Sequence, residues 1–390
     1  MNNQGLYIGI PKEILSGENR VAAIPETVRK LKSKGASVLI ERGAGEGSHY
    51  DDVSYREAGA EIVEDVEDIY RQAAIILKVK EPKFNETKGR HEVDMMHKGQ
   101  YLITFLHPAF PGNHEMVKKL SAQGVTSLTL DSIPRISRAQ SMDALTSMST
   151  VAGYKGVLIA ANFLPKFLPM VGTASGMIQP ARVLVVGTGV AGLQAIATAK
   201  RLGAVVYGAD IRPEACEHAA SVGAKIVELK IPTELAMGKG GYARTLPEEW
   251  LLYERNVLKG PVAESDIIIL SALVPGKLAP VIVTGEMLKS MNSGSVVVDI
   301  AIDQGGNCEL TEAGKTTVKE GVTVVGIQNI PSMVPISSTW MFANNIYNFI
   351  DNMIKDREVH LNTDDEIIST CLLTIDGKIV HAGAKEAMHL

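Results

Sequence analysis

The sequence has few cysteines, few aromatic residues and no cluster of basic residues, and each shortage excludes a class of protein. The three cysteines, Cys216, Cys308 and Cys371, are scattered and lack metal-ligand spacing, which excludes a disulfide scaffold, predicts no metal site and fits a reducing cytoplasm. The net charge is −5 and no basic patch occurs, so we expect no nucleic-acid partner. With 5% aromatic and 45% apolar residues, rich in Val, Ile, Ala and Gly, the composition suits an α/β protein.

A long uninterrupted apolar run is also missing. The most apolar stretch, residues 157–172, is broken by Lys166 and two prolines and is too short to span a bilayer. The first five residues, Met-Asn-Asn-Gln-Gly, show no signal-peptide pattern. We therefore expect no direct membrane insertion, so any role at a membrane would need another chain.

The most informative stretch is residues 181–210, which predicts a dinucleotide site. A β-branched run, Val183–Val186, leads into the glycines Gly187, Gly189 and Gly192 and then into an Ala/Leu-rich helical pattern that includes Val190. The three glycines allow a tight turn, close approach of a pyrophosphate and close packing of helix on strand, and the helix N-terminus offers N–H groups to the phosphates.

An acid follows this motif at the distance that dinucleotide sites require. Asp210 lies 23 residues after Gly187, at the end of the second expected strand, where its carboxylate can bind the adenosine ribose hydroxyls. A carboxylate would repel a 2′-phosphate, which favours NAD over NADP, although Arg212 nearby argues the other way.

Strands alternate with helices along the first 130 residues as well. Strands are expected at residues 6–10, 36–41, 74–79, 101–105 and 125–130, with helices at 25–35, 51–60, 65–73 and 115–124. This spacing predicts a second doubly wound parallel sheet. The expected fold class is α/β, with two Rossmann-like domains and a cleft between them: residues 1–134 plus 333–390, and residues 135–332.

Lys80 and His107 follow two expected strands that should be neighbours, where parallel sheets bind ligands. A lysine there can bind a substrate carboxylate, and a histidine can exchange the proton that accompanies hydride transfer. The alternatives are a solvated lysine and a structural histidine before Pro108.

Arg20 and Asp303 are weaker candidates for the same chemistry. Arg20 follows a tight loop and either reaches the cleft or, as we favour, forms a surface salt bridge. Asp303 is expected to end a strand over residues 296–302, as a cleft carboxylate or as a turn-former before Gly305 and Gly306.

Residues 134–143, Pro-Arg-Ile-Ser-Arg-Ala-Gln-Ser-Met-Asp, form a polar connection between the two regions. Gln140 can hydrogen-bond a nicotinamide carboxamide, and Arg135 and Asp143 can hold each other in place. The alternative is an exposed charged loop. A glycine-rich loop around Gly241 and Tyr242 predicts a mobile flap over the nucleotide.

These segments resemble the NAD(H)-binding alpha subunit of proton-translocating NAD(P) transhydrogenases, a family related to alanine dehydrogenase. The resemblance covers essentially the whole chain, and its most specific pieces are residues 134–143, 187–193, 240–243, 273–280 and 305–309. It implies that NAD(H) contacts the following residues: Arg135, Ile136, Ser137, Gln140, Asp143, Gly187, Gly189, Val190, Gly192, Asp210, Ile211, Arg212, Gly241, Tyr242 and Leu273.

The resemblance also implies an oxidoreductase that passes hydride from NADH to NADP⁺ held on a partner subunit, with Arg135, Gln140 and Asp143 placing the nicotinamide. It further implies a homodimer and a cytoplasmic position at the inner membrane, held there by NADP(H)-binding and membrane-spanning subunits that translocate the protons.

Two motifs fit alanine dehydrogenases better. Residues 77–82, Leu-Lys-Val-Lys-Glu-Pro, and residues 105–108, Phe-Leu-His-Pro, place a lysine and a histidine where those enzymes bind and protonate pyruvate, together with the matches Arg20 and Asp303. Two alternatives therefore stay open: a self-contained NAD-dependent alanine or amino-acid dehydrogenase, and a non-catalytic NAD(H)-binding regulatory subunit.

Overall fold

The computed structural model describes residues 5–238, 243–274 and 277–390, which form two compact units. The first unit comprises Met1–Met148 and Ser332–Leu390, and the second Ser149–Pro331. The chain passes into the second unit within helix α6 (Ala144–Phe163) and is back in the first before helix α12 (Pro335–Asp351). Residues 135–148 therefore belong to the first unit.

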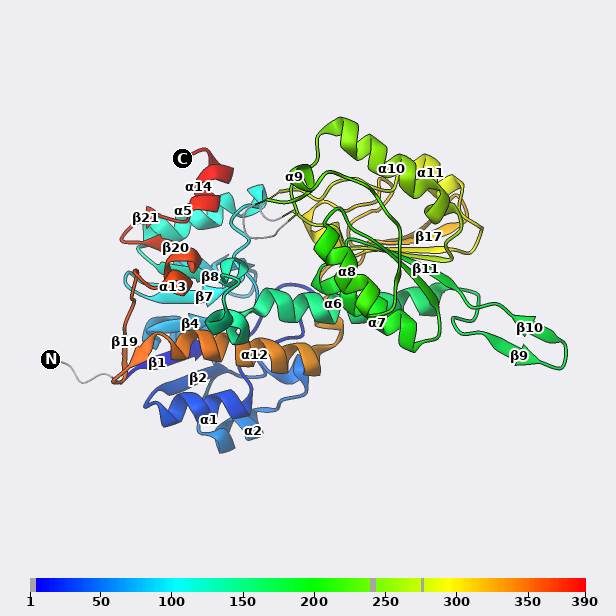
Figure 1. Cartoon of the computed structure of the whole chain (residues 1–390). Coiled ribbons are helices and arrows are strands. Elements are labelled where there is room, and N and C mark those ends of the chain that lie inside the picture. The colour runs from blue at the N-terminus through cyan, green and yellow to red at the C-terminus, as the bar shows by residue number, and fades with distance from the viewer. Residues whose placement is uncertain (1–4, 239–242, 275–276) are drawn as a thin grey trace. The chain divides into compact units, whose positions relative to one another are not determined.

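The first unit contains an eight-stranded sheet in the spatial order β21-β20-β8-β7-β4-β1-β2-β3 (Figure 1). Its six parallel strands are β1 (Tyr7–Ile10), β2 (Ser37–Glu41), β3 (Glu61–Val63), β4 (Ile75–Leu77), β7 (Tyr101–Thr104) and β8 (Thr126–Thr129). The antiparallel strands β20 (Leu372–Ile375) and β21 (Lys378–Ile379) extend it. Asp376 and Gly377, with φ of 49° and 72°, make the tight turn between them.

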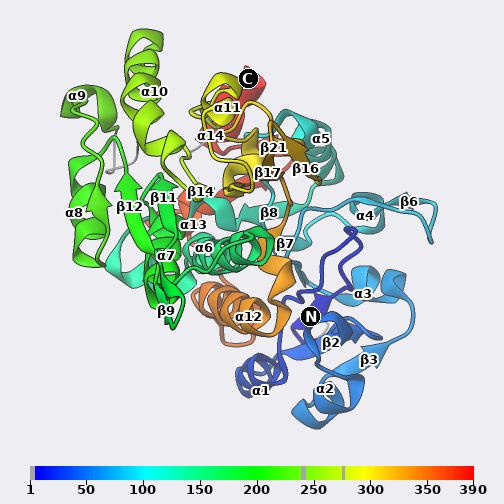
Figure 2. The same ribbon diagram turned by 90° about the vertical axis from the view of Figure 1, so that its right-hand side faces the viewer.

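Helices cover both faces of this sheet. Figure 2 shows α1 (Pro25–Ser33) and α12 on one side, and α3 (Val66–Gln72) and α4 (Glu92–Met95) on the other. The remaining helices of the unit are α2 (Asp52–Ala58), α5 (His114–Gln123), α13 (Glu366–Cys371) and α14 (Ala382–Met388). Helix α12 begins at Pro335, a residue type whose fixed φ and missing N–H suit the first helical turn.

The second unit contains a seven-stranded sheet in the order β13-β12-β11-β14-β15-β17-β16. The parallel strands are β11 (Arg182–Val186), β12 (Val205–Ala209), β13 (Lys225–Ile226), β14 (Ile267–Leu270), β15 (Val296–Asp299) and β17 (Val322–Val325), and β16 (Thr316–Lys319) is antiparallel. Strand order reverses between β11 and β14, which lie side by side in Figure 2. Doubly wound sheets bind ligands beyond the carboxyl ends of the strands at such a reversal.

Alternate residues of β11 build two separate cores. Val183 and Val185 pack with α6 and α7 (Val190–Arg201), whereas Leu184 and Val186 pack with α10 (Glu248–Ala263) and α11 (Gly285–Lys289). Figure 1 shows these helix pairs on opposite faces of the sheet. Helices α8 (Pro213–Ser221) and α9 (Thr233–Ala236) complete the unit. The predicted pair of doubly wound sheets is confirmed.

Several details differ from the sequence-based expectation. Strand β4 ends at Leu77 and β15 at Asp299, so Lys80 and Asp303 lie in the segments that follow rather than at the strand ends. The small hairpins β5 (Phe84–Asn85) with β6 (Arg90–His91), and β9 (Val171–Thr173) with β10 (Gly176–Ile178), were not expected. No helix in the described part of the chain combines the length and the apolar character that crossing a bilayer requires.

Candidate functional site

The three glycines after β11 have distinct structural roles. Gly187 has φ of 84°, and a Cβ added to it would lie 2.6 Å from the backbone nitrogen of Ala272. A Cβ on Gly192 would lie 2.0 Å from the carbonyl oxygen of Gly187. Internal packing therefore requires the first and third glycines.

Gly189 differs because the space beside it is open. It is the N-cap of α7, and an added Cβ would meet only Nη2 of Arg212, at 3.8 Å. The N–H groups of the first helical turn, from Val190 on, have no acceptor within the helix and carry the positive end of its dipole. An anionic pyrophosphate fits this cradle.

Asp210 directly follows β12 and is 8% exposed. Its Oδ2 accepts hydrogen bonds from the backbone nitrogen of Thr188 at 2.8 Å and from Nη2 of Arg212 at 2.9 Å. Its Oδ1 accepts from the backbone nitrogen and Nε of Arg212 at 2.9 and 3.0 Å. The hydrogen bond to Asp210 raises the pKa of Arg212. Asp210 favoured NAD and Arg212 favoured NADP in the sequence, but in the structure the two residues form one bidentate ion pair at the carboxyl edge of the sheet.

The loop after β14 reaches the same edge of the sheet. Leu273 is 36% exposed, and Ser271 Oγ donates to the carbonyl oxygen of Gly187 at 2.7 Å, which ties this loop to the glycine turn. Ile211, next to Asp210, is partly buried. Gly241 and Tyr242, the expected flap residues, lie outside the described residues.

The polar connection forms a 3-10 helix, η4 (Ser137–Met142), in the first unit. Arg138 donates from Nη1 and Nη2 to the carboxylate of Asp365 at 2.8 and 2.7 Å. The carbonyl oxygen of Ser141 accepts from Nδ2 of Asn345 at 2.9 Å and of Asn348 at 3.1 Å. Helix α12 and the segment before α13 thus hold the loop from one side.

The expected binding residues of this loop differ in exposure. Arg135, Ser137 and Gln140 are exposed, and Ile136 is partly buried. Both carboxylate oxygens of Asp143 accept from Thr146, at 2.8 Å from its backbone nitrogen and 2.6 Å from its Oγ1. Asp143 therefore caps the start of α6, while Gln140 is an exposed residue.

His107 lies beyond the carboxyl end of β7 and pairs with Asp131. Its Nδ1 is 2.7 Å from Oδ1 of Asp131, and its ring stacks on Phe105 with centroids 5.6 Å apart. Burial alone would lower the pKa of His107, but Asp131 outweighs it and raises that pKa. With Nδ1 held by a carboxylate, Nε2 is the nitrogen that can exchange a proton. Asp131 was not among the expected site residues.

Lys80 and Glu81 lie close enough to His107 to affect its protonation. The charge of Lys80 lowers the pKa of His107, and that of Glu81 raises it. Strand β4, which precedes Lys80, pairs in parallel with β7, as predicted. The first unit therefore brings Lys80 and His107 together with Asp131.

Arg20 and Asp303 are placed differently from the expectation. Arg20 does form a salt bridge, but a buried one: its Nη2 lies 2.5 Å from Oε2 of Glu18, and the two side chains are 2% and 0% exposed. Its Nη1 also contacts Sδ of Met148 at 2.9 Å. We predicted a salt bridge at the surface, and this prediction was wrong about its position because Arg20 and Glu18 are both buried inside the first unit. Asp303 lies in the 3-10 helix η6 (Ile300–Gln304), where its Oδ2 accepts from the backbone nitrogen of Asn329 at 3.1 Å.

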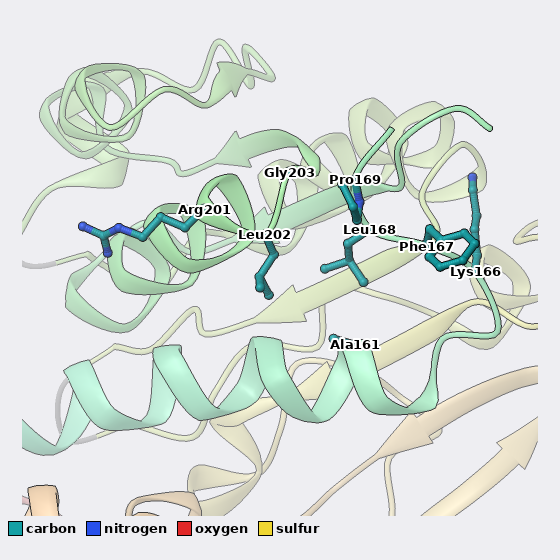
Figure 3. Close-up of a pocket in the computed structure, with 8 residues that line it drawn as sticks. All are labelled: Ala161, Lys166, Phe167, Leu168, Pro169, Arg201, Leu202 and Gly203. Atoms are coloured by element: carbon teal, nitrogen blue, oxygen red, sulfur yellow. The ribbon is translucent and has the colours of Figure 1, made fainter. Parts of the chain in front are cut away.

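A groove of about 560 Å³ lies at the opposite, amino edge of the second sheet (Figure 3). Phe167, Leu168, Pro169 and Leu202 give it an apolar wall, and Lys166 and Arg201 add two cations. Loop 202–204 joins α7 to β12 there, away from Asp210, so this groove is not the nucleotide site. Among the residues described, no group of His, Cys, Asp or Glu is arranged to hold a metal ion.

Comparison with known proteins identifies the relatives of this chain. Residues 9–152 match "Alanine dehydrogenase/PNT, N-terminal domain", and residues 156–382 match the C-terminal domain of the same name. The chain is 42% identical over 379 residues to the first part of the NAD(P) transhydrogenase alpha subunit of Rhodospirillum rubrum, covering 96% of this chain and 98% of the relative.

A more distant relative is an alanine dehydrogenase of Staphylococcus saprophyticus subsp. saprophyticus. The two sequences are 32% identical, and the match covers 99% of this chain and 97% of that enzyme. A solved transhydrogenase structure from Sinorhizobium meliloti superimposes with a TM-score of 0.83 at 39% identity, covering 96% of this chain and 100% of the other. These names indicate a nicotinamide nucleotide as cofactor. With both domain matches and near full-length similarity to transhydrogenase alpha subunits, this chain belongs to the alanine dehydrogenase/PNT family.

Proposed function

We propose that this chain is the NAD(H)-binding alpha subunit of a proton-translocating transhydrogenase, and that hydride passes from NADH to NADP⁺ held on a partner chain. The observation that carries the proposal is the anchored 3-10 helix η4. Arg138 and Ser141 fix it from one side, whereas Arg135 and Gln140 are left exposed. A loop that must meet a second nucleotide needs this combination of a fixed backbone and accessible polar groups.

The described residues fit NAD(H). The Gly189 cradle and the α7 N-terminus suit the pyrophosphate, and Asp210 lies where the adenosine ribose would be. Gln140 would hydrogen-bond the nicotinamide carboxamide, Arg135 would support it, and Leu273 would shield the ring from water. Bound NADH would supply the hydride. The protein's contribution would be to hold two nicotinamides in a reactive geometry, which needs no acid or base.

The relatives' designation as a subunit indicates that partner chains exist. We place the NADP(H) site and the proton path on those partners, and this chain at the cytoplasmic side of the inner membrane, bound to them.

The deciding experiment reconstitutes the purified chain with an NADP(H)-binding subunit and follows hydride transfer from NADH. Gln140→Ala should lower the rate by about 100-fold or more, since loss of orientation affects the reaction steeply. His107→Ala should leave it nearly unchanged. Gln123→Ala, which removes an amide that donates to the Met96 carbonyl oxygen in the same unit, is the matched control. A Gln140→Ala protein as active as wild type would contradict the proposal.

A second function, an NAD-dependent amino-acid dehydrogenase, is favoured by one observation: the His107–Asp131 pair beside Lys80. His107 would exchange the proton at Nε2, and Lys80 would bind the substrate carboxylate. The assay supplies the chain alone with NAD⁺ and L-alanine, then with NADH, pyruvate and ammonium. Robust turnover that His107→Ala abolishes while NADH still binds would establish this function instead. Binding without turnover in either assay would leave a regulatory subunit.

We also propose a homodimer in which the β9–β10 hairpin packs against a second copy of the chain. Met170, Met177 and Ile178 on and beside this hairpin are 55%, 63% and 40% exposed, and Phe167 in the neighbouring groove is 56% exposed. A two-stranded hairpin is marginally stable without a packing partner. Light scattering should report a dimer for wild type and for the polar control Thr173→Lys, and a monomer for Met177→Lys. A wild-type monomer would contradict this proposal.

A further inference from the structure

The motif Gly305-Gly306-Asn307-Cys308-Glu309 has no role in the function proposed above, yet the structure gives it a specific geometry. It follows η6, and Gly305 and Gly306 both have positive φ, 107° and 84°. A Cβ added to Gly306 would lie 2.8 Å from Oδ2 of Asp299. The two glycines thus turn the chain back against the end of β15 and deliver Asn307 to a fully buried position.

The side chain of Asn307 joins the two ends of the loop that follows β14. Its Oδ1 accepts from the backbone nitrogen of Ala272 at 2.9 Å, and its Nδ2 donates to the Ala272 carbonyl oxygen at 2.9 Å. The same Nδ2 donates to the carbonyl oxygen of Pro280 at 2.8 Å. One amide therefore joins Ala272 to Pro280, the two ends of loop 272–280, of which residues 275 and 276 lie outside the described part of the chain.

The backbone of Asn307 is itself held from two directions. Its nitrogen donates to Oδ2 of Asp299 at 2.8 Å, and Cys308 donates to the same oxygen at 3.0 Å. Its carbonyl oxygen accepts from Ile282 at 2.8 Å and Val283 at 3.0 Å. Asn307 is thus a fixed point to which the start and the end of the loop are attached.

The strand order shows which half of a dinucleotide this loop would meet. Asp210 follows β12 and the glycine turn follows β11, so the adenosine half and the pyrophosphate lie over these strands. The other half must continue over β14 and β15, where loop 272–280 begins. That loop presents two exposed leucines, Leu273 at 36% and Leu278 at 70%.

The clamp also links this loop to the glycine turn. Asn307 hydrogen-bonds both the N–H and the carbonyl group of Ala272. Ala272 in turn lies so close to Gly187 that no side chain fits between them. Asn307, together with the hydrogen bond from Ser271 to Gly187, therefore fixes the start of the loop relative to the glycine turn.

We propose that Asn307 is a positioning residue for the nicotinamide half of the cofactor, through its clamp on both ends of loop 272–280. The inference rests on the proposed function only in requiring that the second unit bind a nicotinamide dinucleotide. This inference gives residues 305–309 a role. Gly305 and Gly306 turn the chain so that Asn307 lies beneath loop 272–280, and Asp299 holds the backbone of Asn307 in that position.

The test compares two ligands that share the adenosine half. NADH affinity is measured by nicotinamide fluorescence and ADP-ribose affinity by calorimetry, for wild type, Asn307→Ala and Asn307→Asp. The Asp variant keeps the shape and the acceptor but loses both donors, so it serves even where Asn307→Ala folds poorly. We expect NADH affinity to fall by about tenfold or more and ADP-ribose affinity to change by less than about twofold.

Ser265→Ala is the matched control. It removes a buried hydrogen bond, Oγ to the Pro261 carbonyl oxygen at 2.6 Å, before the amino end of β14 in the same unit. It should leave both affinities unchanged. Equal loss of NADH and ADP-ribose binding in the Asn307 variants would indicate a general structural role and overturn the proposal, as would unchanged NADH binding. A wild-type chain that binds no NADH would instead overturn the proposed function.

Discussion

Nδ1 of His107 lies 2.7 Å from Oδ1 of Asp131, while Oδ2 of the same carboxylate accepts from the backbone nitrogen of His107 at 2.8 Å. One carboxylate thus holds the histidine by ring and backbone. His107 also has φ of 44°, a conformation that costs energy for a residue other than glycine and persists only where contacts impose it. The pair fixes the ring tautomer and leaves Nε2 available.

This pairing predicts a pH-dependent loss of stability in Asp131→Asn. The folded state raises the pKa of His107 above its usual value of 6.5, so its stabilisation is full below that value and disappears as pH rises through the folded pKa. Urea unfolding should therefore show a larger deficit for the variant at pH 6 than at pH 9. Lys98→Gln, a change at an exposed site in the same unit, is the control. A deficit that grows toward pH 9 would contradict the assignment.

The Asp210–Arg212 pair predicts a change of cofactor preference. The hydrogen bonds from Thr188 and Arg212 occupy the usual acceptor positions of Asp210, so Arg212 would have to shift for a ribose to bind there, as we propose. In Asp210→Asn the charge that holds Arg212 is gone, and the guanidinium becomes available to a 2′-phosphate.

Fluorescence titration of Asp210→Asn should show NADH affinity about tenfold lower and NADPH affinity higher than in wild type. Asp266→Asn, which alters an acid paired with Lys166 before the amino end of β14, is the control and should change neither affinity. An unaltered ratio of NADH to NADPH affinity would show that the Asp210–Arg212 pair does not determine the preference between the two cofactors.

A buried ionic cluster in the first unit predicts a large stability effect. Nζ of Lys78 lies 2.8 Å from Oε1 of Glu92 and 3.4 Å from Oε2 of Glu13, and all three side chains are at most 3% exposed. Lys78→Met would leave two buried carboxylates without their cation and should cost roughly 3–5 kcal/mol in free energy of unfolding. Lys118→Met, which breaks an exposed pair with Glu115, should cost under about 1 kcal/mol. Equal effects would mean that the cluster is not stabilising.

The sequence predicts the second unit well because its signals are local. The glycine spacing, the apolar run into Gly187 and the acid at Asp210 all lie within one strand–helix–strand segment, where chain geometry alone determines their relative positions. Missed strands such as β3, β5, β6, β9, β10 and β16 have at most four residues each. Segments this short carry too few residues to show a period.

The unforeseen features of the site depend on contacts between distant segments. His107 meets Asp131 because β7 and β8 pair with Thr104 opposite Thr129, a register that no single strand encodes. Asn307 reaches Ala272 only after the ends of β14 and β15 come together. Buried Arg20 contacts Met148, which lies 128 residues away in the sequence. Such placements follow from the assembled fold, not from a local pattern.

Glu254 provides the last test, since its protonation depends both on the packing of the second unit and on the charge of Asp210. This residue of α10 is 4% exposed. Burial first, and then the nearby charge of Asp210, raise its pKa from 4.5 to about 7, while Arg255 opposes the shift. The stability that comes from its protonated form is full below pH 4.5 and is lost as pH rises through about 7.

The variant Glu254→Gln has a neutral side chain at every pH and therefore does not lose stability as pH rises. At pH 8 it should be more stable than wild type, by up to about 3 kcal/mol, because each pKa unit corresponds to about 1.4 kcal/mol. Below pH 4.5 the two proteins should converge. Urea unfolding from pH 4 to 9 measures the difference, with Glu249→Gln on the exposed side of the same helix as the control. A Glu254→Gln protein less stable than wild type at pH 8 would show that the ionised carboxylate is stabilised by contacts that outweigh its burial.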